Sequence, residues 1–89
     1  MSSELNNYLS FLYSKGFRFG EDFLGFIQFG KGYTNANDKL LIAAIEITLK
    51  VQKSFDGAFF IALLETFQQE GIKGRQEALS FAKRMALLR

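Results

Sequence analysis

The chain of 89 residues contains no cysteine, no histidine, no proline and no tryptophan. Without cysteine it forms no disulfide, and it has no thiolate for catalysis or metal binding. Without histidine it lacks the commonest general base and the commonest transition-metal ligand. The absence of proline, together with 48% hydrophobic residues, favours a packed, largely helical domain over a disordered chain.

Patterns typical of enzymes are also missing. A nucleophilic triad needs a base beside the hydroxyl group, and no histidine is available for that role. The carboxylate pairs Glu21 with Asp22 and Asp38 with Glu46 are conceivable acid–base groups, but carboxylates at helix starts are ordinary caps. Residues 30–32 lack the spacing of a nucleotide-binding fingerprint. We therefore expect a protein that is not an enzyme and binds neither cofactor nor metal.

Long hydrophobic runs are absent as well. The longest apolar stretch, residues 40–51, contains Glu46 and Lys50, and it is far shorter than the ~20 residues that span a bilayer. Residues 1–15 lack the basic start and apolar run of a secretory signal. We expect a soluble, cytoplasmic protein without a membrane partner.

Apolar periodicity predicts an all-α fold, a single compact domain of about five helices over residues 1–89. Residues 40–47 are apolar almost all around and indicate a central, buried helix. Residues 30–37 are rich in turn formers and predict a loop, and alternation within residues 16–32 leaves a short hairpin as an alternative. The expected helices run from Ser2 or Ser3 to about Gly16, from Glu21 to Gly30, from Asn35 or Asn37 to about Lys53, from about Ala58 to Glu70, and from about Arg75 to Leu87.

The chain has eleven phenylalanines, which is many for its length. Aromatic side chains near two short helices usually fill a small core. We therefore expect packing roles for the aromatic residues of the second quarter of the chain, namely Phe17, Phe19, Phe23, Phe26, Phe29 and Tyr33.

The helix expected near residues 58–70 carries Phe59, Leu63 and Phe67 at four-residue spacing, which places them on one helix face. This stripe is either a core face or a binding surface. Phe60 and Leu64 extend the apolar character beyond one face, and a monomer of this size hides only part of it. We expect one side of this helix to be buried and the other to contact a partner.

The last part of the chain is basic. From Gly71 to the end there are five basic residues against the single acidic residue Glu77, although the whole chain carries a net charge of only +2. Cations near the start of a helix suit phosphate, because the helix dipole and free N–H groups also attract anions. The alternative is a solvated helix face. The candidate phosphate-binding residues are Lys73, Arg75, Lys83 and Arg84.

Residues 36–84 resemble the C-terminal domain of the DnaD and DnaB family of primosomal proteins. That family carries tyrosine, isoleucine and tryptophan at four-residue spacing, then a Gly-Ile-Lys turn and a Glu-Ala pair. The corresponding residues here are Phe59, Leu63 and Phe67, then Gly71-Ile72-Lys73, then Glu77-Ala78. The whole chain is also similar to a small uncharacterised protein family of Gram-positive bacteria.

The chain departs from the DnaD-type pattern in two respects. Phenylalanine replaces both tyrosine and tryptophan, which removes their polar groups, and Gly74 stands where the family has a hydroxylated helix cap. The resemblance implies a non-enzymatic module that contacts single-stranded DNA or a replication-initiation partner, with Phe59 and Phe67 stacking on bases or packing. The alternative is a bacterial or phage protein-interaction module, such as a homo-oligomer, that does not bind nucleic acid.

Overall fold

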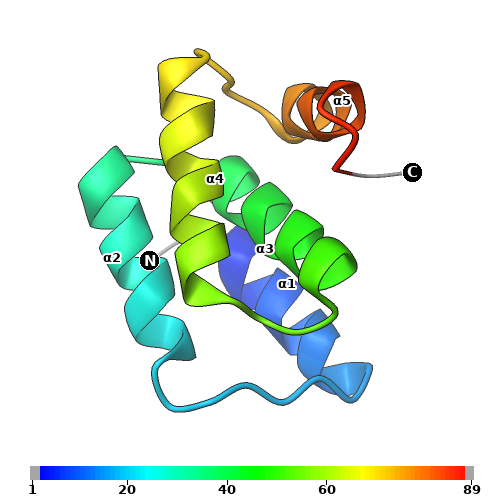
Figure 1. Cartoon of the computed structure of the whole chain (residues 1–89). Coiled ribbons are helices and arrows are strands. Elements are labelled where there is room, and N and C mark those ends of the chain that lie inside the picture. The colour runs from blue at the N-terminus through cyan, green and yellow to red at the C-terminus, as the bar shows by residue number, and fades with distance from the viewer. Residues whose placement is uncertain (1–2, 88–89) are drawn as a thin grey trace.

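The computed structural model describes residues 3–87, a range that contains five α-helices and no strand (Figure 1). The helices are α1 (Ser3–Ser14), α2 (Phe23–Thr34), α3 (Asp38–Gln52), α4 (Gly57–Gln69) and α5 (Arg75–Arg84). The predicted all-α class is confirmed, and the hairpin alternative is wrong because residues 23–34 form a helix. Two residues used in the predictions, Ser2 and Arg89, lie outside the described range.

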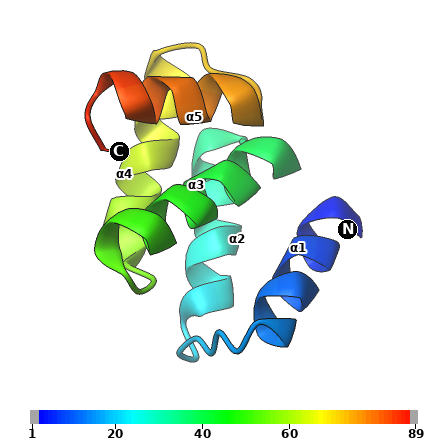
Figure 2. The same ribbon diagram turned by 90° about the vertical axis from the view of Figure 1, so that its right-hand side faces the viewer.

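Helix α3 occupies the centre of the molecule, as its apolar sequence predicted. It packs against each of the other four helices, and α2 also packs against α4. Figure 2 shows α5 lying across one side of α3, whereas α1 lies on another side. Six side chains of α3 are completely shielded from solvent: Leu41, Ala43, Ala44, Ile45, Ile47 and Thr48.

Two side-chain caps fix the starts of the central helices. The Asn37 side chain accepts a hydrogen bond from the Leu40 amide at 2.9 Å, and the Asp56 carboxylate accepts one from the Phe59 amide at 3.0 Å. The Asp38 carboxylate accepts from the Leu5 amide at 3.0 Å and thereby joins the start of α1 to the start of α3. These caps explain why the predicted starts of α3 and α4 are nearly correct.

The predicted end of the second helix at Gly30 is wrong, because α2 continues to Thr34. Gly30 is buried against α4, where an added Cβ would lie only 2.6 Å from Leu64 Cδ1. This glycine therefore permits close packing of two helices and does not end one. Helix α2 ends instead at Asn35, which adopts the left-handed conformation with φ of 55°.

Three helices end in the same hydrogen-bonded turn. After α1 the Phe17 amide donates to the Leu12 carbonyl, and after α4 the Ile72 amide donates to the Phe67 carbonyl, each around a left-handed glycine. After α5 the Leu87 amide donates to the Ala82 carbonyl. The left-handed residue there is an alanine, Ala86, so no glycine in the sequence signals that α5 ends at Arg84.

The aromatic residues of the second quarter divide into two groups. Phe19 and Phe23 stack with ring centroids 4.0 Å apart, and Phe55 packs edge-on against Phe23 at 4.7 Å, so the predicted packing is confirmed for Phe19 and Phe23. Phe26 is also packed against the core. The prediction is wrong for the three rings that are exposed to solvent, which are Phe17, Phe29 and Tyr33.

Candidate functional site

The predicted stripe on α4 is mostly core. Phe67 is 0% exposed and Leu63 is buried, whereas Phe59 is half-buried. The reason is that α4 packs against α2 and α3 at once, so its apolar residues are covered on two sides. The Phe67 ring contacts Phe81 of α5 edge-on at 6.3 Å. Phe67 therefore packs in the core, which is the second of the two roles expected for it, and is not available to stack on a base. Leu63 does not reach a partner either.

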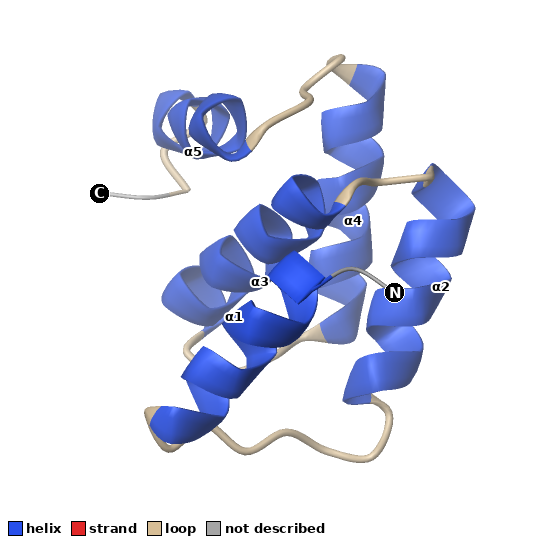
Figure 3. Cartoon of the chain, turned by 180° about the vertical axis from the view of Figure 1, so that it is seen from behind, coloured by secondary structure: helices blue, strands red, loops and turns tan. Residues whose placement is uncertain are grey.

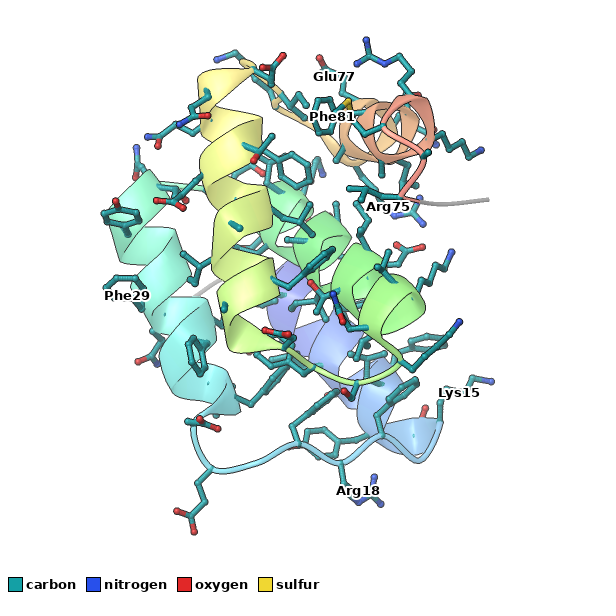
Figure 4. All side chains as sticks on the ribbon, viewed as in Figure 1. Lys15, Arg18, Phe29, Arg75, Glu77 and Phe81 are labelled. Carbon is teal, nitrogen blue, oxygen red and sulfur yellow. The ribbon has the colours of Figure 1, made fainter. Side chains whose placement is uncertain are left out.

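Arg75 was a candidate phosphate ligand, but its guanidinium group is paired within the chain. Its Nε and Nη2 atoms donate to the Glu46 carboxylate over distances of 2.9 to 3.0 Å, and Lys50 Nζ lies 3.2 Å from the same carboxylate. Such fork-shaped contacts are the strong form of an ion pair. Arg75 thus ties the start of α5 to the middle of α3 (Figure 4).

The other predicted cations of the last segment do not join Arg75 in one array. Arg84 follows Arg75 by nine residues, which is about two and a half helical turns, so the two side chains leave α5 on opposite sides. Arg84 lies 5.8 Å from the Phe81 ring and lines a shallow groove with Glu70 and Glu77. Lys73 and Lys83 are exposed. The four cations therefore do not form the continuous phosphate track that we expected.

A different surface combines exposed rings with cations. It covers the end of α1, the following loop and the neighbouring parts of α3 and α5. Phe11, Tyr13 and Phe17 are 52%, 48% and 39% exposed on it. We call it the basic–aromatic face, and it wraps around the end of α1. Tyr8, Phe11, Lys15, Phe17, Lys50 and Arg75 lie at or beside one groove, and Tyr13 and Arg18 lie on the other side of the end of α1.

The cations of this face lie close to its rings. Lys15 Nζ is 5.5 Å from the centre of the Phe11 ring, and the Arg18 guanidinium is 5.5 Å from that of Tyr13. The Arg18 group also donates to the carbonyls of Tyr13 and Phe17, which closes the turn after α1. Lys15 and Arg18 project from one end of the molecule in Figure 4. Cation–π contacts of this kind hold a charged group above an aromatic surface while leaving it open to anions.

A groove runs across the basic–aromatic face between α1, α3 and the start of α5. Its apolar walls come from Phe11, Leu12, Phe17 and Leu49. Its polar edge comes from Tyr8, Glu46, Lys50 and Arg75. An apolar floor beside cations is suited to a ligand that has flat rings and negative charge.

Tyr8 forms part of this groove and is perturbed by it. Burial and, to a smaller extent, the nearby Glu46 carboxylate raise the pKa of Tyr8 to about 12, and Arg75 opposes them. The Tyr8 hydroxyl is thus neutral and can act as a hydrogen-bond donor. Among the described residues, one carboxylate lines the groove, that of Glu46, and two cations already balance it.

Among residues 3–87 there is no group of three or more carboxylate, histidine or cysteine side chains that could hold a metal ion. Residues 30–32 lie inside α2 and do not form a phosphate-binding loop. Phe11, Lys15 and Lys50 were not among the candidate residues predicted from the sequence. The four-residue spacing of Phe11 and Lys15 could have indicated the first contact.

The model of a protein family of unknown function (DUF6123) matches residues 1–88. The chain belongs to this family. No curated protein and no solved structure matches it, and nothing in the family description connects it to DnaD-type domains. None of the helices within residues 3–87 is both long and apolar enough to cross a membrane.

Proposed function

We propose that the protein is a non-enzymatic module that binds single-stranded nucleic acid along the groove of the basic–aromatic face. The observation that carries this proposal is the placement of Lys15 and Lys50 beside the exposed Phe11 and Phe17 rings, around one groove. Proteins that bind single strands combine stacking rings with cations that follow the phosphates. This site replaces the α5 track that the sequence suggested.

The proposed roles follow from the chemistry of each side chain. Phe11 and Phe17 offer the solvent-exposed parts of their rings to unpaired bases, and Lys15 and Lys50 hold phosphate groups. Arg75 is held by three hydrogen bonds to Glu46, so it positions α5 and contributes little free charge. Lys50 makes one contact of 3.2 Å with the same carboxylate and its side chain is 59% exposed, so its ammonium group can turn to a phosphate. Because rings stack on any base and lysine contacts any phosphate, we expect binding with weak sequence preference.

A salt-dependent titration tests the charge part of the proposal. Fluorescence anisotropy of a labelled single-stranded DNA oligonucleotide should show binding that weakens as salt rises. The variant K15Q/K50Q should make the dependence of log affinity on log salt less steep by about 1.4, because each lost phosphate contact on a single strand removes about 0.7. The matched control K83Q/R84Q removes the same charge from α5 and should leave the slope unchanged.

Absence of binding at tens of micromolar protein in low salt would contradict the proposal that the protein binds single-stranded nucleic acid. If K83Q/R84Q lowered the salt dependence of binding as much as K15Q/K50Q, the cations of α5 would also contact the phosphates and the proposed site would be wrong. In the ring test, Phe11→Ala should weaken binding about 5- to 150-fold, because stacking contributes ~1–3 kcal/mol per base. Phe29→Ala, an equally exposed ring on α2, is the control and should have no effect.

A further inference from the structure

A second exposed apolar surface lies on α2, away from the proposed nucleic-acid site. Leu24, Phe29 and Tyr33 are 54%, 58% and 59% exposed there, and the Phe29 and Tyr33 rings stack with centroids 5.4 Å apart. Figure 4 shows Phe29 pointing outward from α2 on the side of the molecule opposite to Lys15. We call this surface the α2 outer face, and it consists of Leu24, Gly25, Gln28, Phe29, Lys31, Gly32 and Tyr33.

An apolar groove borders the α2 outer face on one flank, between α2 and α1. In Figure 3, which shows the molecule from behind, α2 is at the right and α1 runs from the centre to the lower left. The apolar walls of the groove are Leu5 and Leu9 from α1 and Leu24 and Ile27 from α2. Its polar residues are Asn6, Gln28, Lys31 and Asp38, of which Asp38 accepts a hydrogen bond from the Leu5 amide.

We propose that a second copy of this chain packs on the α2 outer face, with Phe29 and Tyr33 of each copy entering the groove between α1 and α2 of the other. At 100° per residue, Phe29 and Tyr33 lie on one flank of the exposed side of α2, and Leu24 and Lys31 lie on the other. A two-fold rotation about an axis parallel to α2 brings the ring flank of each copy against the groove flank of the other. The same contact is then made twice, as in other closed dimers.

The charge of the two surfaces favours a second copy as the occupant. Helix α2 contains one charged residue, Lys31, so copies that meet here bring few like charges together. Lys31 would lie near a ring of the other copy, where a cation is attracted to the aromatic face. The basic–aromatic face carries several cations and would repel its own copy.

The area that a dimer needs also indicates how far the contact extends. A standard interface covers about 800 Å² of each partner. That is roughly one seventh of the 5606 Å² exposed by this chain. A single helix of twelve residues is about 18 Å long and offers too little surface by itself. The contact must therefore reach across the groove to α1, as the proposed arrangement does.

The glycines on this face provide a variant that separates packing from folding. A Cβ added at Gly25 or Gly32 meets no atom within 4 Å, in contrast to Gly30, so nothing within the described chain requires glycine there. Glutamine favours a helix more than glycine does. The variant G25Q/G32Q should therefore stabilise the single subunit and obstruct the approach of another helix.

Sedimentation equilibrium over about 5 to 500 µM protein tests the proposal, because a dimer depends on concentration. The mass should rise from 10.1 kDa toward twice that value. The variant F29S/Y33S should raise the dissociation constant about tenfold or more, since buried rings dominate interfaces. The control F11S/Y13S, which removes two rings from the other face, should leave the dissociation constant unchanged.

Three results would overturn the proposal. They are a single mass of 10.1 kDa over the whole range, a dimer that F29S/Y33S leaves intact, and a dimer that only F11S/Y13S disrupts. G25Q/G32Q should weaken the dimer while raising the Tm at low concentration by about 5 °C. If it raised the Tm and left the dimer unaffected, the close approach of the two α2 helices would be wrong.

Discussion

The basic–aromatic face and the α2 outer face expose similar amounts of large apolar side chain, but they differ in charge. On the first face, Lys15 and Arg18 lie over the rings, and Lys50 and Arg75 line the groove. On the second, Lys31 is the one charged residue of the helix. Apolar exposure alone therefore marks a contact surface without naming the partner. The charge around the rings indicates the kind of partner: several cations favour a polyanion, and few charges favour a neutral protein surface.

The two faces also differ in how the backbone supports them. The basic–aromatic face is built from three helices and a loop. Arg18 closes the loop by hydrogen bonds to its backbone, and the ion pair of Glu46 with Arg75 connects α3 to α5. The α2 outer face is one regular helix. A ligand that follows a path across several elements suits the first surface, and a helix packed against a helix suits the second.

The largest expected effect concerns the core that separates the two faces. Phe67→Ala removes a fully buried ring and should lower the free energy of unfolding by ~3–5 kcal/mol. Phe29→Ala, at a ring exposed in the single subunit, should change it by less than ~0.5 kcal/mol at low protein concentration. Urea unfolding followed by circular dichroism measures both. Equal losses in the two variants would contradict the distinction between core and surface rings.

A smaller effect is expected within α2 itself. Gly30→Ala should lower the free energy of unfolding by ~1–2 kcal/mol, because the new methyl group meets Leu64 at 2.6 Å and Phe60 and Ile61 at 3.1 Å. Gly32→Ala faces open space and should raise it by ~0.5–1 kcal/mol in the single subunit. Thermal unfolding at low protein concentration compares the two. Stabilisation by both substitutions would show that α2 and α4 are less closely packed than described.

Glu46→Gln should act on the two properties of the basic–aromatic face in opposite directions. Loss of the carboxylate that binds Arg75 and Lys50 should lower the free energy of unfolding by ~1–2 kcal/mol, a value reduced because both cations are half-exposed. The freed Arg75 should strengthen nucleic-acid binding and steepen its salt dependence by ~0.7, as one new phosphate contact. Urea unfolding and anisotropy on the same sample measure both. Weaker binding would argue against a phosphate site here.

The smallest effect at neutral pH concerns Tyr8, whose pKa is raised to about 12 by burial first and by Glu46 second. The pKa of Tyr8 in the folded protein lies above the ordinary value of 10. The stability that comes from keeping this hydroxyl neutral is therefore fully present below pH 10 and is lost as the pH rises toward 12. A pH titration of tyrosinate absorbance should contain a step near pH 12 that Tyr8→Phe removes. If the step removed by Tyr8→Phe lay near pH 10, the burial of this hydroxyl would be refuted.

Much of the fold was predictable because its signals are local. Asn37 and Asp56 cap their helices, and Gly71 ends α4, each through contacts within a few residues. The errors at Gly30 and Ala86 have another origin. Gly30 resembles a helix end in the sequence, and only its contact with α4 shows another role. Ala86 adopts the left-handed conformation, which an alanine in a sequence does not predict.

The candidate site was less predictable for the same reason. Arg75 and Glu46 are 29 residues apart, so their pairing depends on how α5 lies on α3. The exposure of Phe29 and Tyr33 arises because α2 is apolar on nearly all sides and the domain covers only one of them. The separation of Arg75 from Arg84 is different, because their nine-residue spacing already places them on opposite sides of a helix.

The most direct test of the separation between the two faces is an NMR titration of isotope-labelled protein with a single-stranded DNA oligonucleotide at low salt. The account predicts that amide signals of residues 8–18 and 46–50 shift on addition of DNA, whereas those of residues 24–33 stay in place. Shifts confined to α2 or α5, or the absence of any shift, would contradict it.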